Sequence, residues 1–185
     1  MDIGIAQRPA RGEEVCGDGF AVARLADAAL ICVIDGLGHG AEAHVAAEMA
    51  RRAALAHAHL DLPGLAAMID RELVGTRGAA LGLVRLSVEL ELVCGAIGNV
   101  EISGGGTLRL HSFSTPGIVG RKAPRLRVGR SLLTPGDRVF VYTDGVSRRF
   151  KASAFAALSA QPAAEAILAG HGAMHDDATC VVIDC

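Results

Sequence analysis

An apolar run that ends in a carboxylate and a glycine-rich turn most constrains how this 185-residue chain can fold. Residues 28–35, AALICVID, have the length and composition of a buried strand. The turn GLGHG follows, and then an alanine-rich segment in which apolar residues recur at helical spacing: Val45, Met49, Ala53, Ala56 and Leu60. The pattern predicts a central strand over 28–35 and a helix over 41–60, whose small alanines allow close packing on a sheet.

The remaining predicted strands come in blocks rather than in strict alternation with helices. Strands are predicted over 3–7, 19–24, 79–89, 90–98, 104–113, 125–129, 137–144 and 178–185. A second helix is predicted over 64–74, two short helices interrupted by Gln161-Pro162 within 152–170, and turns in 98–106 and 114–120. This order favours an α+β layered fold over a doubly wound parallel one. With no internal repeat or linker, a single domain over 1–185 is expected.

Composition and charge narrow the class of protein. Hydrophobic residues make up 51% of the chain and aromatic residues only 3%, so Ala, Val, Leu and Ile must build the core. The net charge of -2, without a basic block, argues against a nucleic-acid partner. No apolar stretch has the length of a membrane span, and the N-terminus lacks a signal-peptide pattern. Five cysteines without a CxxC pair predict buried, reduced thiols in a cytoplasmic protein rather than disulfides or a zinc site.

Acidic residues stand at the ends of four predicted strands. They are Asp18 in CGDGF, Asp35 in VIDG, Asp144 in VYTDG, and the pair Asp176-Asp177 in HDDATCVVI. Carboxylates that converge raise one another's pKa values unless cations neutralise them, and hard ions such as Mg²⁺ or Mn²⁺ suit oxygen ligands. Taken singly, an Asp-Gly pair is more often a turn than a ligand.

Gly36 and Asp137 are interpreted from the conformational freedom of glycine and from turn chemistry. Gly36 leaves room for a metal ion or a backbone carbonyl to approach Asp35 closely. Asp137, in the sequence TPGD, is interpreted as part of a turn rather than of a metal site.

These segments, in this order, resemble the protein phosphatase 2C (PPM) family, in particular its bacterial sporulation and stress-response branch. The segments that carry the resemblance are CGDGF, VIDGLGHGAEA, LTPGDRVFVYTDGV and HDDATCVVI, and it covers essentially the whole chain. It implies a four-layer α-β-β-α sandwich of two antiparallel sheets, with two Mn²⁺ or Mg²⁺ ions at one edge. It also implies hydrolysis of phosphoserine or phosphothreonine on a protein.

The resemblance also implies a role for each carboxylate. Asp35 would bridge both metal ions, and the Gly36 carbonyl would help to bind one of them. Asp18 would approach that same ion, largely through water. Asp144 and Asp176 would hold the second ion, so that Asp35, Asp144 and Asp176 form the catalytic set, with Asp177 in a supporting role. A metal-activated water as nucleophile needs no covalent enzyme intermediate, in keeping with the lack of a nucleophilic Cys motif or a G-x-S-x-G motif.

Histidines do not complete this pattern simply. Some better-studied relatives have a histidine two residues after the bridging aspartate, where this chain has Leu37. His39 either reaches the leaving oxygen or only lines the turn or caps the helix, and the second interpretation is favoured. His175 has either a role behind Asp176 or a place in a solvated loop, again with the second favoured. His57 and His59 are interpreted as surface or boundary residues.

A basic run follows the Asp144 turn, where related sequences often have an acidic residue. It contains Arg148, Arg149 and Lys151. A solvated helix start is the commoner fate of such a run. The functional alternative is a basic edge that attracts phosphate or an acidic partner surface.

In length, the chain is similar to the stand-alone RsbX-type phosphatases of the stressosome. This similarity implies a phosphorylated STAS-domain protein as substrate and the resetting of a stress or sigma-factor pathway. One alternative is a phosphatase-fold module that binds a STAS or kinase partner with little turnover. Another is a GHKL-type ATP-binding kinase, which also uses a D-x-G-x-G turn but would leave Asp144 and Asp176 unexplained.

Overall fold

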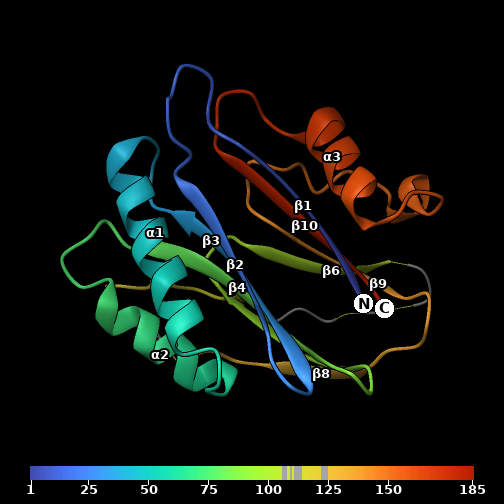
Figure 1. Ribbon diagram of the computed structural model, residues 1–185. Coiled ribbons are helices and arrows are strands. Elements are labelled where there is room, and N and C mark those ends of the chain that lie inside the picture. The colour runs from blue at the N-terminus through green and yellow to red at the C-terminus, as the bar shows by residue number, and fades with distance from the viewer. Residues whose placement is uncertain (106–107, 109, 111–113, 122–124) are drawn as a thin grey trace.

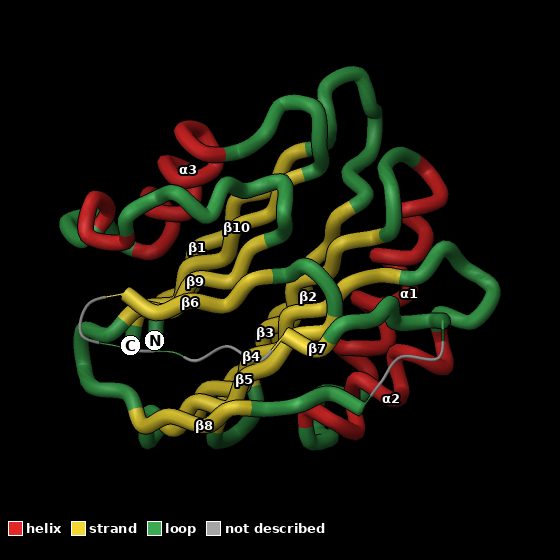
Figure 2. The backbone as a smooth tube through the Cα atoms, turned by 180° about the vertical axis from the view of Figure 1, so that it is seen from behind, coloured by secondary structure: helices red, strands yellow, loops and turns green. Residues whose placement is uncertain are grey.

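Two mixed-order sheets face each other, and helices cover their outer faces (Figures 1 and 2). The computed structural model describes residues 1–105, 108, 110, 114–121 and 125–185. The first sheet has the order β1 (Asp2–Arg8), β10 (Ala178–Asp184), β9 (Arg138–Tyr142), β6 (Glu101–Gly105). The second has the order β2 (Asp18–Arg24), β3 (Ala28–Gly36), β4 (Ala79–Ser87), β5 (Glu91–Ile97), β7 (Ser114–Thr115), and β8 (Gly129–Leu132) also pairs with β5. Among the described strands, every pairing is antiparallel except that of β5 with β7.

The helices lie on opposite sides of this pair of sheets. Helices α1 (Ala41–Ala56) and α2 (Leu62–Glu72) cover the sheet that contains β3, while α3 (Ala160–His171) covers the sheet that contains β10 (Figure 1). A short 3₁₀ helix, η1 (Ala152–Phe155), precedes α3. The α+β prediction is confirmed.

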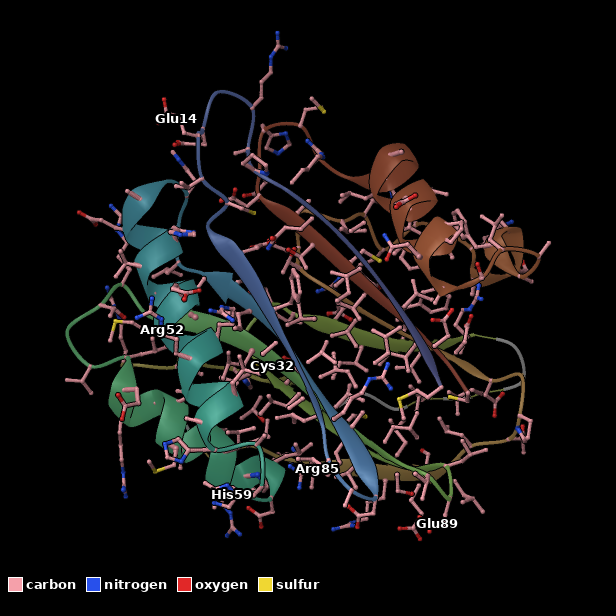
Figure 3. All side chains as sticks on the ribbon, in the orientation of Figure 1. Glu14, Cys32, Arg52, His59, Arg85 and Glu89 are labelled. Carbon is pink, nitrogen blue, oxygen red and sulfur yellow. The ribbon has the colours of Figure 1, made fainter. Side chains whose placement is uncertain are left out.

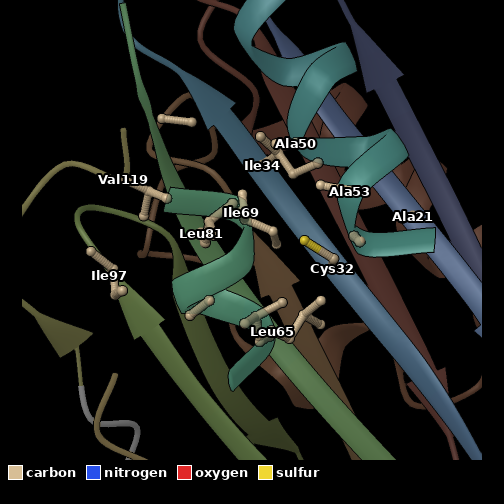
Figure 4. Packing of buried hydrophobic residues seen from close by; sticks show 14 of the residues in the cluster. Ala21, Cys32, Ile34, Ala50, Ala53, Leu65, Ile69, Leu81, Ile97 and Val119 are labelled. Carbon is tan, nitrogen blue, oxygen red and sulfur yellow. The ribbon is translucent and has the colours of Figure 1, made fainter. Parts of the chain in front are cut away.

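Three apolar layers hold the structure together, and β3 contributes to two of them. Leu30, Cys32 and Ile34 pack in the cluster under α1 and α2, where Figure 4 shows Cys32 and Ile34, whereas Ile31 and Val33 pack between the sheets. Side chains alternate across a strand, so a strand buried on both faces must be apolar throughout. This double burial explains the continuous apolar run over 28–35.

The third apolar layer, under α3, collects most of the described aromatic side chains. Phe140 and Tyr142 of β9 both make edge-on contacts with Phe150, at ring-centroid distances of 5.4 and 5.2 Å. Phe155 of η1 packs in the same layer, which α3 closes with Ala160, Ala163, Ala164, Ile167 and Leu168.

The buried face of α1 differs in part from the predicted one. Val45 is 53% exposed and Ala56 is also exposed, whereas Ala53 is buried and Met49 and Leu60 pack against the core beside it. The buried face consists of alanines: Ala43, Ala46, Ala47, Ala50, Ala53 and Ala54. A Cβ on Gly19 of β2 would lie 3.3 Å from the Ala47 Cβ, so the helix sits too close for larger side chains. The predicted close packing through alanine is confirmed, and the predicted face is right at Met49, Ala53 and Leu60 but wrong at Val45 and Ala56.

Two strand predictions need correction, and a third lies mostly outside the described residues. Residues 101–105, predicted as a turn, form β6, which pairs with β9. Pairing with β5 starts at Gly129, so the strand predicted over 125–129 is instead Gly129–Leu132. Of the strand predicted over 104–113, residues 106–107, 109 and 111–113 lie outside the described part of the chain.

The predicted break at Gln161-Pro162 is wrong because Pro162 lies in the first turn of α3. Proline is tolerated there, since the first N–H groups of a helix have no partner within it. The Gln161 amide group exchanges two hydrogen bonds with the backbone of Ile5, at 2.8 and 2.9 Å, and so ties the start of α3 to β1.

Cysteines and charged side chains are placed as the composition indicates. All five cysteines are free, and Cys32, Cys94 and Cys180 are buried. Figure 3 shows Cys32 in the interior, whereas the labelled Glu14 and Glu89 lie at the periphery. Among the described residues, no helix has both the length and the apolar character needed to cross a membrane.

Candidate functional site

The predicted carboxylates lie at strand ends that the two sheets bring to one edge. In one sheet, β2 begins at Asp18 and β3 ends at Gly36, and Asp18 pairs directly with Asp35. In the other sheet, β9 ends just before Thr143-Asp144 and β10 begins just after Asp176-Asp177. Because neighbouring strands are antiparallel, the end of one lies beside the start of the next.

Two buried threonines connect the sheets at this edge. The Thr143 hydroxyl donates a hydrogen bond to Oδ2 of Asp18 at 2.8 Å and accepts one from the backbone N–H of Thr179 at 3.0 Å. Both threonines are fully buried. They hold Asp18, which belongs to one sheet, against the strand ends of the other.

Asn99 makes a second connection. Its Nδ2 donates to Oδ2 of Asp144 at 2.6 Å, and a hydrogen bond from the same side chain lowers the pKa of Asp35. Asn99 lies in the connection between β5 and β6, where the chain passes from one sheet to the other. Asp144 is therefore held beside Asp35 by an uncharged donor.

Burial and mutual repulsion raise the pKa values of these acids. Burial raises the pKa of Asp18 to about 7, with further contributions from Asp177 and Asp176. Burial also raises the pKa of Asp35 to about 8, followed by repulsion from Asp18, Asp144 and Asp176. The pKa of Asp176 is raised as well, by desolvation and then by Asp144. Four strand-end carboxylates thus affect one another, which is the convergence that the sequence predicted.

The donors at this edge fit hard divalent cations. Oδ2 of Asp35 is buried and has no hydrogen-bond partner among the described residues. An unpartnered buried carboxylate oxygen is costly unless a cation or a proton compensates it. Within the described ranges, no three His, Cys, Asp or Glu side chains already form a ligand group for one ion. The fit therefore rests on charge, burial and the all-oxygen donor set.

The glycines after Asp35 and Asp144 are positions of close backbone approach. A Cβ on Gly36 would lie 2.3 Å from the carbonyl oxygen of Ala43, and one on Gly145 would lie 1.9 Å from that of Asp177. The Gly36 N–H also donates to the Gly17 carbonyl at 3.1 Å. The close approach of backbone carbonyls to Gly36 is as predicted. These two Asp-Gly pairs are thus sites of tight packing and not merely surface turns.

Asp177 and Asp137 are both buried and both accept hydrogen bonds, but Oδ2 of Asp177, like that of Asp35, has no partner among the described residues. Oδ1 of Asp177 accepts from the Ala10 N–H at 2.9 Å, and its own N–H donates to Oδ1 of Asp176 at 3.0 Å, so it positions its neighbour. Oδ2 of Asp137 accepts from the N–H and the hydroxyl of Thr134 at 2.8 and 2.9 Å. The interpretation of Asp137 as part of a turn is confirmed.

The four histidines weighed as candidates from the sequence are either exposed or half-buried. Nδ1 of His39 is 2.6 Å from Oε1 of Glu13, and 67% of the His39 side chain is exposed, so it faces the 11–14 loop. His175 is exposed, and its charge lowers the pKa of Asp176. His57 is half-buried and His59 exposed, as expected for boundary residues.

The basic run after Asp144 is exposed to solvent. Arg148 forms an ion pair with Glu101 at 2.5 Å, and Arg149 and Lys151 are exposed. The predicted helix start is displaced, because residues 147–151 precede η1 rather than begin a helix.

Thr143, Thr179 and Asn99 are the residues of this site that the sequence did not reveal. The threonines stand within apolar segments, where a buried hydroxyl needs a partner. The need of a buried hydroxyl for a partner therefore could have identified both threonines. Asn99 gives no such indication, because the sequence of its segment is typical of a simple turn.

No family model matches the chain, and no curated protein matches it. Among solved structures, it is similar to one from the bacterial stressosome, described as a modular system adapted to control secondary messenger signalling. That structure has 27% identity and a TM-score of 0.91, over 98% of this chain and 97% of the other. A structure of RsbX in complex with magnesium has 18% identity and a TM-score of 0.83, over 96% and 92%.

A serine/threonine phosphatase of Mycobacterium tuberculosis, PstP/Ppp, has 17% identity and a TM-score of 0.70, over 99% of this chain and 97% of the other. The chain has the PP2C phosphatase fold. These PP2C relatives support the resemblance that the four sequence segments indicated, including its RsbX-like branch.

Proposed function

We propose that this PP2C-fold chain is a Mn²⁺- or Mg²⁺-dependent protein serine/threonine phosphatase. The observation that carries the proposal is the cluster of carboxylates at one edge of the two sheets. Asp18 and Asp35 both have pKa values raised toward neutrality, and Asp35 keeps an unpartnered buried oxygen. Such a cluster is unfavourable by itself and becomes favourable when divalent cations bind to it.

Each carboxylate has a role in this proposal. Asp35, the Gly36 carbonyl and Asp18 would hold one ion, and Asp35 together with Asp144 and Asp176 would hold the other. The Thr143 hydroxyl occupies one oxygen of Asp18, and Asn99 occupies one oxygen of Asp144. These neutral donors fix the orientation of both carboxylates and add no positive charge that would compete with a metal ion.

The chemistry follows from this arrangement. When bound, two divalent ions supply an activated water near neutral pH and screen the charge of the phosphate. Thr143, Thr179 and Asn99 hold the carboxylates of the cluster in a fixed orientation, so the site is preorganised before a substrate binds. His39 contacts Glu13 and is mostly exposed, so the proposal gives it no role as a proton donor to the leaving group.

The proposed substrate is a phosphorylated STAS-domain protein in the bacterial cytoplasm. Support comes from the similar structures, which include one from the stressosome, RsbX, and the RsbU and RsbW domains of a Mycobacterium tuberculosis protein. Removal of phosphate from a serine or threonine of such a protein would return a stress or sigma-factor pathway to rest.

The test combines hydrolysis of an aryl phosphate monoester with calorimetric measurement of metal binding. Hydrolysis should need Mn²⁺ or Mg²⁺ and cease in EDTA. Asp35→Asn should bind metal more weakly and reduce turnover to background while remaining folded. Asp61→Asn is the matched control, because Asp61 caps α2 far from the cluster and Asn caps a helix equally well.

Full activity of Asp35→Asn would refute the assignment of the site. A folded wild-type protein that binds metal but hydrolyses neither an aryl phosphate nor a phosphorylated STAS protein would instead indicate a binding module.

A further inference from the structure

A pocket of about 390 Å³ opens directly beside Asp35. Asp35 is the one charged residue among the described residues that line it. Two polar side chains at its wall are already engaged: the Ser114 hydroxyl donates to the Gly98 carbonyl at 2.6 Å, and Asn99 donates to Asp144. What remains for a ligand is mainly apolar surface, next to the proposed metal centre.

Leu37 and Ile118 form the apolar walls of this pocket, and the backbone holds both in place. The Leu37 N–H donates to the Gly78 carbonyl at 3.0 Å. A Cβ on Gly78 would lie 2.7 Å from Cγ2 of Ile118, so Ile118 packs directly on Gly78. Val119, the next residue, exchanges two backbone hydrogen bonds with Ala79, at 3.0 and 2.8 Å. The walls are therefore preformed.

Leu37 is the point at which the sequence departs from relatives with a histidine. Its side chain is a large hydrophobic one that is 38% exposed, in a glycine-rich turn next to a buried acid. The replacement of a titratable side chain by leucine removes a proton donor and adds an apolar surface at the same place. That exchange gives the pocket an apolar wall within reach of whatever binds at Asp35.

Two arginines flank the same side of the pocket. Arg77 lies beside Gly38, since a Cβ on Gly38 would be 3.0 Å from its Nη1, and it forms an ion pair with Glu42. Nε of Arg121 donates to the Arg77 carbonyl at 3.2 Å, and the Arg121 N–H donates to Ile118 at 3.3 Å. Glu42 balances the charge of Arg77, so Arg121, whose side chain bonds only to a backbone carbonyl among the described residues, supplies the positive charge of the rim next to Ile118.

We propose that this pocket is a specificity site for the segment that flanks the phosphorylated residue. A large aliphatic side chain adjacent to the phosphoserine would enter between Leu37 and Ile118, and an acidic residue farther along would lie against the arginine rim. The proposal rests on the proposed phosphatase function and deepens it. It is supported by the continuity of the pocket with Asp35 and by the positive charge of Arg121, which Glu42 does not balance as it balances that of Arg77.

The test uses three phosphoserine peptides. The first has leucine on both sides of the phosphoserine, followed by two acidic residues. The second has alanine in place of both leucines, and the third has amides in place of the acids. The kcat/KM of the wild-type protein should be at least about tenfold higher for the leucine peptide than for the alanine peptide. The preference for acids over amides should decrease as salt is added.

Variants then locate the preference. Ile118→Ser should reduce the leucine-to-alanine ratio to less than about threefold, and Leu37→Ala, at the opposite wall, should reduce it as well. Arg121→Gln should remove most of the preference for acidic residues. Val74→Ser, at an apolar residue that is 71% exposed and does not line the pocket, is the matched control and should keep both preferences.

The outcomes separate this inference from the proposed function. Equal kcat/KM values for the leucine and alanine peptides, in a protein that hydrolyses an aryl phosphate, would overturn the specificity site and leave the phosphatase intact. A leucine preference that survives both Ile118→Ser and Leu37→Ala would overturn the assignment to this pocket. Failure to hydrolyse the aryl phosphate with any metal would overturn the proposed function itself.

Discussion

Asp18→Asn should stabilise the metal-free protein, and by an amount that depends on pH. Asp18 is 5% exposed, and burial raises its pKa from 3.8 to about 7. The folded state therefore holds a proton on Asp18 that the unfolded state releases, so the stability of the wild-type protein falls as pH rises from about 4 to 7. Asparagine has no charge to bury, and its side-chain oxygen can still accept the hydrogen bond from Thr143.

The size of the effect follows from the two pKa values. The pKa difference of Asp18 corresponds to about 4 kcal/mol at pH 8, where the folded group is ionised, and to about 2 kcal/mol at pH 5. In EDTA, the free energy of unfolding of Asp18→Asn should exceed that of the wild-type protein by these amounts. Divalent metal should then stabilise the wild-type protein more than the variant, because binding requires the carboxylate.

Urea unfolding at pH 5 and pH 8, each with EDTA and with Mn²⁺, measures the free energy of unfolding of both proteins under these four conditions. Asp61→Asn, outside the cluster, should show neither the gain in EDTA nor the loss of metal response. If Asp18→Asn follows the same pH dependence as the wild-type protein in EDTA, burial of an ionisable Asp18 is not a source of instability. The electrostatic account of the cluster would then be wrong.

Two further changes test how the cluster is held together. Gly145→Ala places a Cβ 1.9 Å from the Asp177 carbonyl, so it should lower the free energy of unfolding by at least about 3 kcal/mol and weaken metal binding as well. Gly170→Ala in α3, where a Cβ meets nothing within 4 Å, is the control and should be neutral or stabilising. Urea unfolding and metal titration compare the two variants. Thr143→Val removes the donor to Asp18 and the acceptor of the Thr179 N–H and should cost about 1–3 kcal/mol in EDTA, while Thr143→Ser keeps both bonds; equal stability of the two variants would contradict a role for the hydroxyl.

The carboxylate positions could be predicted from sequence because a strand signals where it ends. A continuous apolar run over 28–35 marks a strand buried on both faces, and the structure places that strand inside its sheet, between β2 and β4. Asp35 then has to be at the edge of the buried region. The same logic locates Asp144 after β9 and Asp176 before β10. Antiparallel pairing then brings Asp144 close to Asp176 in one sheet and Asp18 close to Asp35 in the other.

Close packing explains where the sequence misled. Hydrophobicity alone ranks Val45 above the alanines of α1, but the closest approach of the helix to β2 admits only small side chains. The strand at 101–105 was hidden for a related reason. Its glycines look like a turn, yet a Cβ on Gly105 would lie 2.8 Å from the Phe140 ring, so glycine is required within the strand.

The cross-sheet bonds of Thr143 and Asn99 depend on a distance that no local pattern encodes. Asp18 and Asp35 belong to one sheet and Asp144 to the other, so repulsion among the acids acts to separate the sheets at this edge. The Thr143–Asp18 and Asn99–Asp144 hydrogen bonds oppose that separation with neutral donors. A lysine or arginine in their place would neutralise the carboxylates permanently and abolish their affinity for cations. The use of uncharged donors thus keeps the edge both assembled and negatively charged, which is the condition for a metal centre that can bind and activate a water.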